Sequence, residues 1–399
     1  MINQYDAIIV GAGPSGATTA YLLAQSGLKV ALVDKSEFPR NKLCGGGLTI
    51  RSIKAFENIF ACDLSDVLEF ESRGIAFYNK NTYLNKLEDY QSLKFIYRTD
   101  FDYHLVKKAQ AVGADFIQKF NIADIDASTN TITDKQGKQY RARFIVGADG
   151  IKSIVSRKVF SQSFDKERYA IAMEAEIDRD VFSRSVNLPE IYYGSIKWGY
   201  GWVFPKKDCI TVGIAGLYKH NKDIKSVFLK FLEDDLGLSS SSVEMKGYYL
   251  PFGQYNKNLA KGSVLLVGDA AGLVDPITGE GIAFAMESGQ FAAESILEAE
   301  QANNPASAGA FYTRKIKKIT RCIDHANYVK YLIYPEFFKR ILVKGLAAST
   351  DKYSIRYYLD LLADEISYPQ FISRLLRKSG LKIVRLAVGR KQLNSNIVK

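Results

Sequence analysis

The chain has 399 residues, of which 47% are hydrophobic and 24% charged, and its formal net charge is +11. This length and composition are typical of a globular protein with one large composite domain or two. Its apolar runs are too short for a transmembrane helix, and its four cysteines and three histidines are too scattered to predict disulfides or a metal site.

A dinucleotide-binding pattern opens the chain. An apolar strand at 7–10 runs into Gly11, Gly13 and Gly16, and a second apolar strand ends in Asp34. Gly11 allows a tight turn, Gly13 lets the backbone approach a pyrophosphate, and Gly16 lets helix and strand pack closely. Asp34 is placed to accept ribose hydroxyls and disfavours a 2′-phosphate, so the pattern predicts FAD or NAD rather than NADP. The first strand starts close to Met1 and leaves no room for a signal peptide, so we expect a cytoplasmic protein.

A glycine-rich loop follows, in which Cys44 precedes three consecutive glycines at 45–47. Each glycine in a helix or strand costs about 0.5–1 kcal/mol relative to alanine. The run therefore predicts close approach of the backbone to a flat ligand, and the alternative is a flexible surface loop.

The middle of the chain alternates between strand and helix patterns. Apolar and polar residues alternate from Gly74 to Tyr97, which predicts antiparallel strands. Arg98 precedes a helix that we expect Thr99 or Asp100 to cap and Gly113 to follow. The sequence then predicts β segments at 115–119, 122–125, 131–133 and 144–146. A helix carrying Ser153 and Arg157 is predicted after them.

The stretch from Tyr169 to Tyr249 is strongly β and rich in aromatic residues, with one helix at about 224–236. Such a sheet is a candidate floor of a substrate pocket, although aromatic residues in strands are more often plain core. A buried strand at 264–267 then ends in Gly268-Asp269, a helix begins near Gly281, and the chain is helical from Ala306.

Several of these motifs together resemble the FAD-dependent para-hydroxybenzoate hydroxylase superfamily: the glycine fingerprint, Arg98, the run 147–150 and the run 268–270. Two stretches, Lys42–Leu48 and Tyr200–Lys206, are similar to signatures of the geranylgeranyl reductase family within it. The resemblance covers about residues 7–296. It implies an α/β fold, with a Rossmann-type FAD-binding domain, an inserted largely antiparallel β-sheet substrate domain and a C-terminal helical segment. We place the FAD-binding domain at 1–70, 98–165 and 258–305, the substrate domain at 71–97 and 166–257, and the basic helical region at 306–399.

That family reduces isolated C=C bonds in prenyl chains of lipids, chlorophyll precursors and quinones. The resemblance implies FAD contacts beyond the fingerprint glycines, at Ser15, Asp34, Cys44, Gly45, Gly46, Gly47, Arg98, Ala123, Asp269, Gly281 and Ile282. The chain carries one dinucleotide fingerprint only, so we expect the electrons to come from transiently docked NAD(P)H or from a ferredoxin-like protein.

An isolated alkene needs a hydride on one carbon and a proton on the other, in a dry slot with a positioned proton source. Cys44 is the titratable side chain inside the glycine-rich loop and is one candidate, with an inert buried thiol as the alternative. Glu280 is the other candidate, with a solvated turn residue as its alternative. Tyr200, Trp202 and Phe204 occupy alternate positions of one strand and would line the slot on one face.

The main rival function is oxygen chemistry, because flavin hydroxylases and halogenases share this scaffold. The run 198–205 is similar to the W-x-W-x-I-P motif of tryptophan halogenases. Halogenases, however, usually carry a G-E-[ST] turn where this chain has the run 44–47. A prenyl-chain reductase is therefore the favoured interpretation.

Positive charge is concentrated in the C-terminal quarter, where 19 Lys and Arg stand against 6 Asp and Glu from Gln301 onward. No recognisable nucleic-acid-binding module accompanies this charge, so nucleic acid is not an expected partner. Between Ile372 and Arg390, basic residues recur at helical spacing on one side and apolar residues on another. The basic set is Arg374, Arg377, Lys378, Lys382 and Arg385, and the apolar set is Leu376, Ile383, Val384 and Ala387. We expect this segment to touch an anionic membrane surface at the inner face, and the alternative is a solvated basic helix docked on the body.

Overall fold

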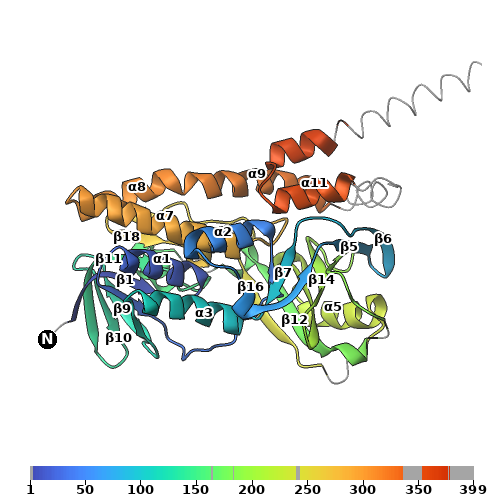
Figure 1. Cartoon of the computed structure of the whole chain (residues 1–399), viewed down its shortest axis with the longest axis horizontal. Helices are drawn as coiled ribbons and strands as arrows, with labels where there is room; N and C mark the ends of the chain where they lie inside the picture. The colour runs from blue at the N-terminus through green and yellow to red at the C-terminus, as the bar shows by residue number, and fades with distance from the viewer. Residues whose placement is uncertain are drawn as a thin grey trace, which may run out of the picture.

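The computed structural model describes residues 3–162, 165–182, 184–239, 243–335, 353–375 and 377. Two sheets lie side by side in Figure 1, and long C-terminal helices cover them from above. The fold is α/β, as the sequence predicted. Among the described residues no helix is long and apolar enough to cross a membrane.

The first sheet has five parallel strands at its centre, in the order β8-β2-β1-β11-β18. Its first βαβ unit is β1 (Asn3–Val10), α1 (Pro14–Gln25) and β2 (Val30–Val33). The other parallel strands are β8 (Asp115–Ile117), β11 (Gln139–Gly147) and β18 (Val264–Leu266). The central strands are buried on both faces, which explains why they read as continuous apolar runs.

Shorter elements complete this half of the molecule. Three antiparallel strands extend the sheet: β9 (Ile122–Asp126), β10 (Thr131–Asp134) and β17 (Ala260–Lys261). The helices are α3 (Arg98–Ala111), α4 (Ile154–Phe160), α6 (Gly268–Ala271) and α7 (Ile282–Gln301). The predicted cap of α3 was wrong, because the strand before it ends at Ile96 and the helix starts at Arg98 with Tyr97 as an N-cap that makes no side-chain hydrogen bond. Gly113 does follow α3, with a φ of +102°.

The second sheet has seven strands, in the order β16-β12-β15-β14-β13-β5-β6. These strands are β5 (Ile75–Asn79), β6 (Thr82–Leu87), β12 (Ala170–Asp178), β13 (Glu190–Tyr193), β14 (Gly199–Pro205), β15 (Cys209–Leu217) and β16 (Lys246–Leu250). All neighbours pair antiparallel except β13 and β5, which are parallel. The predicted helix at 224–236 is α5 (Ile224–Lys230) continued by a π-helical turn at Phe231–Asp235.

A small sheet and a layer of helices join the two halves. The small sheet contains β3 (Gly47–Leu48), β7 (Leu93–Ile96) and β4 (Leu68–Ser72). The covering helices are α2 (Ile50–Phe60), α8 (Ala308–Lys315), α9 (Lys317–Ile333) and α11 (Tyr353–Leu362). Residues 368–375 are helical as well. Ile355 and Leu359 of α11 pack with Phe77 and Trp202, so the C-terminal helices close one side of the second sheet.

Candidate functional site

The glycine fingerprint forms a tight turn at the carboxyl end of β1. A Cβ added to Gly11 would lie 2.4 Å from the carbonyl oxygen of Ala148, and one added to Gly16 would lie 1.8 Å from that of Gly11. Gly13 differs, because an added Cβ would meet only Nη2 of Arg40, at 3.6 Å. The turn therefore needs glycine at two positions for packing, and leaves open space beside the third.

Asp34 lies at the carboxyl end of β2, beside this turn. Its side chain accepts hydrogen bonds from the backbone N–H of Ala12 and of Ser36, each at 2.8 Å. These two bonds hold the carboxylate at the carboxyl end of β2, where the sequence predicted a partner for ribose hydroxyls.

Two arginines converge on one buried carboxylate next to Gly13. Arg98 binds Asp102 through Nε at 2.7 Å and Nη2 at 2.8 Å, and Arg40 reaches the same carboxylate at 3.1 Å. Nη1 of Arg40 is buried and has no hydrogen-bond partner in the described part of the chain. Two arginines and one aspartate leave one positive charge uncompensated, and Arg40 has a free N–H donor beside the open space at Gly13. Both features suit a phosphate group. The sequence predicted Arg98 for this role and missed Arg40.

The glycine turn after β1 also lies close to the predicted FAD contacts that follow β18. Gly268 has a φ of +54°, and a Cβ there would lie 2.8 Å from Oγ of the buried Ser15. Asp269 follows at the start of α6 and is half-buried. Gly281 is the N-cap of α7, and backbone N–H groups at the start of a helix suit negative charge; the N–H of Ala283 already donates to Glu280. Ala123 is exposed on β9, and its contact with adenine stays a prediction.

The three glycines of the loop 44–47 pack onto aromatic side chains. A Cβ on Gly45 would lie 2.8 Å from Nε1 of Trp202 and 3.0 Å from Phe204. Gly46 has a φ of +75°, and a Cβ there would lie 2.1 Å from the carbonyl oxygen of Ile96. The loop thus lies closely against β7 and β14, and the predicted approach of its backbone to a flat ligand stays a prediction.

The three aromatic residues that the sequence predicted to line a substrate slot lie on the face of β14 that this loop covers. The ring centroids of Tyr200 and Trp202 are 6.2 Å apart, and those of Trp202 and Phe204 are 6.3 Å apart, which confirms that the three share one face. Nε1 of Trp202 is buried without a partner among the described residues, and the hydroxyl of Tyr200 donates to the carbonyl oxygen of Thr278 at 2.8 Å. The same apolar cluster includes Phe77, Phe95, Tyr193, Tyr358 and Leu359.

Cys44 stands beside two groups that titrate near neutral pH. Its N–H donates to Oε1 of Glu174 at 2.8 Å, and its Sγ accepts from the N–H of Gly46 at 3.4 Å. Oε2 of Glu174 is buried and lacks a partner in the described residues. Burial raises the pKa of Glu174 to about 7 and lowers the pKa of Lys42 to about 8. The sequence analysis missed Glu174, and the only signal there was the first of three acids in a largely apolar strand.

Glu280, the other candidate proton donor, ties two helices together. Its carboxyl accepts from the hydroxyls of Thr49 and Ser52 at the start of α2, and from the N–H of Ala283 in α7. Burial raises its pKa. These contacts give Glu280 a positioning role at the start of α7, and its part in proton transfer stays a prediction.

Comparisons with known proteins agree with this geometry. Residues 4–192 match the family model described as an FAD binding domain, and the chain is an FAD-dependent oxidoreductase. An uncharacterized protein of Methanosarcina barkeri is 31% identical over 84% of both chains. The digeranylgeranylglycerophospholipid reductase of Methanocaldococcus jannaschii is 27% identical over 94% of this chain and 96% of the relative.

The fold is shared with a solved structure described as a geranylgeranyl bacteriochlorophyll reductase-like protein from Thermoplasma acidophilum. The TM-score is 0.78 at 24% identity, covering 94% of this chain and 100% of that one. The chain belongs to the geranylgeranyl reductase family, as the motifs around Cys44 and Trp202 predicted.

Proposed function

We propose that the protein saturates isolated C=C bonds of a prenyl lipid or quinone chain. Bound FAD, in its reduced form, would supply the hydride. The observation that carries the proposal is the aromatic face of Tyr200, Trp202 and Phe204, the predicted lining of a slot, which is apolar and lies directly against the loop of Cys44. Such a slot suits a hydrocarbon chain, because burial of its CH₂ groups contributes about 0.8 kcal/mol each.

The residues around the slot would bind the cofactor, orient the alkene and deliver the proton. The free donor of Arg40 and the N-terminus of α7 would hold the anionic parts of FAD. The aromatic side chains would orient the alkene and exclude water. Cys44, with Glu174 hydrogen-bonded to its backbone, would deliver the proton to the second carbon.

The test is an anaerobic assay of the FAD-loaded protein, chemically reduced, with a geranylgeranyl substrate. Mass spectrometry should show a gain of two hydrogen atoms for each double bond reduced. Detection of a C4a-hydroperoxyflavin and an oxygenated product after mixing with oxygen would instead support a monooxygenase. Wild-type protein that binds FAD and leaves the alkene unchanged would contradict the proposal.

We also propose transient contact with an anionic membrane surface, where prenyl substrates reside. Tyr328, Tyr331 and Leu332 of α9 are exposed by 76%, 59% and 47%, which supports this proposal. Of the predicted basic segment at 372–390, residues 376 and 378–390 lie outside the described residues. Within the described part, Arg374 pairs with Asp360 at 3.5 Å and Arg377 is exposed.

Vesicle co-sedimentation of the full chain tests this contact. Replacing Lys378, Lys382 and Arg385 by Gln should weaken binding to anionic vesicles, because each basic residue contributes about 1 kcal/mol there. Binding to neutral vesicles should not change. Equal partitioning of both proteins onto anionic vesicles would assign the basic segment to another partner.

A further inference from the structure

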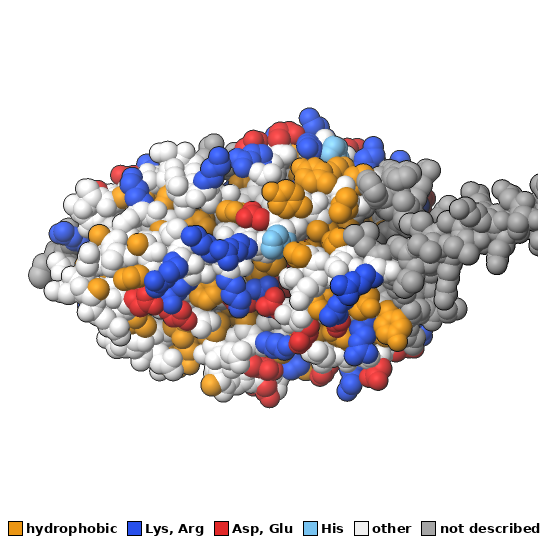
Figure 2. Space-filling model, turned by 90° about the horizontal axis from the view of Figure 1, so that it is seen from above, with side chains coloured by type: hydrophobic (Ala, Val, Ile, Leu, Met, Phe, Trp, Pro, Cys, Tyr) orange, Lys and Arg blue, Asp and Glu red, His pale blue; other side chains and the backbone are white. Residues whose placement is uncertain are grey.

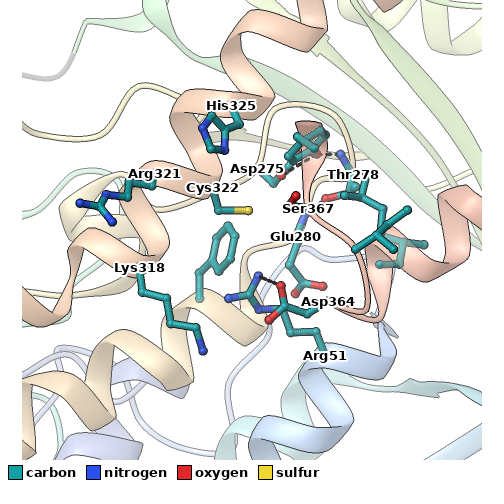
Figure 3. Close-up of a pocket in the computed structure, with 15 residues that line it drawn as sticks. Arg51, Asp275, Thr278, Glu280, Lys318, Arg321, Cys322, His325, Asp364 and Ser367 are labelled. Carbon is teal, nitrogen blue, oxygen red and sulfur yellow. Dashed lines mark hydrogen bonds and ion pairs between the residues drawn. The ribbon is translucent and has the colours of Figure 1, made fainter. Parts of the chain in front are cut away.

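Charges of both signs are mixed on the helical side of the molecule. Figure 2 shows Lys and Arg side chains standing among Asp and Glu side chains on this face. In the pocket of Figure 3, Arg51 reaches Asp364 at 3.3 Å, and it also binds Glu287 through two bonds of 2.7 Å. A charge with less compensation lies in the second sheet, at Lys206.

Lys206 directly follows β14 and is only 1% exposed. Its backbone is fixed, because its N–H donates to the carbonyl oxygen of Cys209 at 2.9 Å and its carbonyl oxygen accepts from Nε and Nη2 of Arg179 at 2.8 and 2.6 Å. Its Nζ lies 3.9 Å from the ring centroid of Tyr97 and 3.5 Å from Oε1 of Glu176, its one ion pair within the described part of the chain. Burial of an ammonium group costs free energy unless the group is well paired, so this lysine calls for a role beyond packing.

The side chain of Lys206 lies beneath the loop of Cys44. A Cβ added to Gly46 would meet Cε of Lys206 at 3.5 Å. Two residues before Gly46, the N–H of Cys44 donates to Oε1 of Glu174. Glu176 follows Glu174 by two positions in β12, so both carboxylates project from one face of the sheet. The side chain of Glu176 is 57% exposed, and the cluster therefore runs from the loop to solvent.

Glu174 has open coordination on this face. Its Oε2 is buried and has no hydrogen-bond partner among the described residues. On one side its cross-strand neighbour is Gly213 of β15, which has no side chain. On the other side its neighbour is Lys246 of β16, which is exposed and pairs with Glu244 at 3.4 Å. The carboxyl is thus held through one oxygen and is free to exchange a proton at the other.

The charges around Glu174 act on its proton in opposite directions. Burial raises its pKa, and the charged neighbours modify that effect. Lys206 and Lys42 lower the pKa, because a nearby cation favours the ionised carboxylate. Glu176 raises the pKa, because a nearby anion favours the protonated form. A change at Lys206 and a change at Glu176 should therefore have opposite effects.

We propose that Lys206 and Glu176 are positioning residues whose charges decide whether Glu174 holds the proton that recharges Cys44. In each reduction the thiol of Cys44 gives its proton to the alkene carbon. The O–H bond of Glu174 then breaks as the S–H bond of Cys44 forms again, and the carboxylate takes a proton from solvent on the side of Glu176. This inference rests on the proposed function and deepens it, since it assigns the groups that set the pH range of proton supply.

The first experiment titrates the FAD-loaded protein without substrate by pH-difference infrared spectroscopy, with Glu174→Gln to identify the carboxyl band. Lys206→Met should raise the midpoint of Glu174 by about one pH unit. Glu176→Gln should lower it by about half a unit, because this anion is more exposed and better screened. Lys207→Met, at the exposed neighbouring position, is the matched control and should leave the midpoint unchanged.

Equal midpoints in the wild type and Lys206→Met, or shifts of the same sign in the two variants, would overturn the proposal. If Lys206→Met does not fold, Glu176→Gln still decides, since it changes a largely exposed side chain. A lower midpoint there supports the proposal, and an unchanged one overturns it.

The second experiment measures the pH dependence of prenyl reduction by chemically reduced holoenzyme. The rate should fall as pH rises through the midpoint of Glu174, and this limb should move up in Lys206→Met and down in Glu176→Gln. A limb that stays in place while the infrared midpoint moves would overturn the proposal and leave the reductase function standing. If the wild type reduces no alkene, the proposed function fails, and the infrared titration still decides whether Lys206 and Glu176 control the proton of Glu174.

Discussion

The FAD site of the first sheet and the proposed substrate site of the second are built by different means. In the first sheet the site is made by backbone, since an added Cβ at Gly11 or Gly16 would lie within 2.4 Å of a carbonyl oxygen. In the second sheet it is made by large side chains, with Trp202 packed between Tyr200 and Phe204. Substitutions in the first region should therefore remove the cofactor, and those in the second should change the reaction while FAD stays bound.

Gly16→Ala should have the largest effect on FAD binding and stability. A mild effect would contradict the view that the first site is made by backbone. The new methyl group would overlap the carbonyl oxygen of Gly11, so β1 and α1 must move apart. We expect loss of FAD and a fall of about 3 kcal/mol in the free energy of unfolding of the apoprotein. Flavin absorbance after desalting and denaturant unfolding measure the two effects.

Gly13→Ala is the matched control within the same turn. Its Cβ would make one ordinary contact, and its φ of −75° suits alanine. Apoprotein stability should therefore stay within about 0.5 kcal/mol of the wild type, and FAD affinity should fall because the methyl group occupies the open space beside Arg40. A loss of stability as large as that of Gly16→Ala would show that the turn has no open side.

Cys44→Ala tests whether a change beside the aromatic residues alters the reaction while FAD stays bound. We expect FAD to remain bound and prenyl reduction to fall about 10- to 100-fold, the range for a misplaced proton source. Cys62→Ala, which changes a half-buried thiol of the first core, should keep full activity. Full activity in Cys44→Ala as well would assign Cys44 to packing.

Glu174→Gln should leave FAD bound and act through the pH dependence of stability. The pKa of Glu174 rises from the usual 4.5 to about 7 on folding, so the native state binds the extra proton between these values. Wild-type stability should fall as pH rises from 4.5 to 7, by on the order of 3 kcal/mol from this group. The variant should lose that part of the slope in denaturant unfolding of the holoenzyme. Asp178→Asn, at the exposed end of the same strand, should keep the slope, and an unchanged slope in Glu174→Gln would show that the carboxyl does not titrate there.

The cofactor side was predictable from sequence because its parts lie within one local unit. Gly11, Gly16 and Asp34 follow one another through a single strand, helix and strand, and each position has one backbone reason for its residue type. Strand alternation likewise predicted the shared face of Tyr200 and Trp202. These inferences needed only local geometry.

The contacts of Glu174 and of Arg40 could not be predicted in this way. Glu174 meets Cys44 across 130 positions of sequence, and Arg40 meets Asp102 across two different elements. One pocket of the structure likewise combines Arg51 of α2 with Lys318 of α9. The local sequence around each of these residues does not show which distant residue it will contact, because tertiary packing brings the two together.

The parallel pairing of β5 with β13 has a consequence for how the protein is made. Strand β5 leaves the ribosome more than a hundred residues before β13, and β18 completes the first sheet only at Val264–Leu266. Both sheets therefore keep an unpaired edge during most of translation, and such edges template aggregation. A shortened gene product ending before β18 should collect in inclusion bodies, and slower translation or a chaperone that covers strand edges should raise the yield of the full chain.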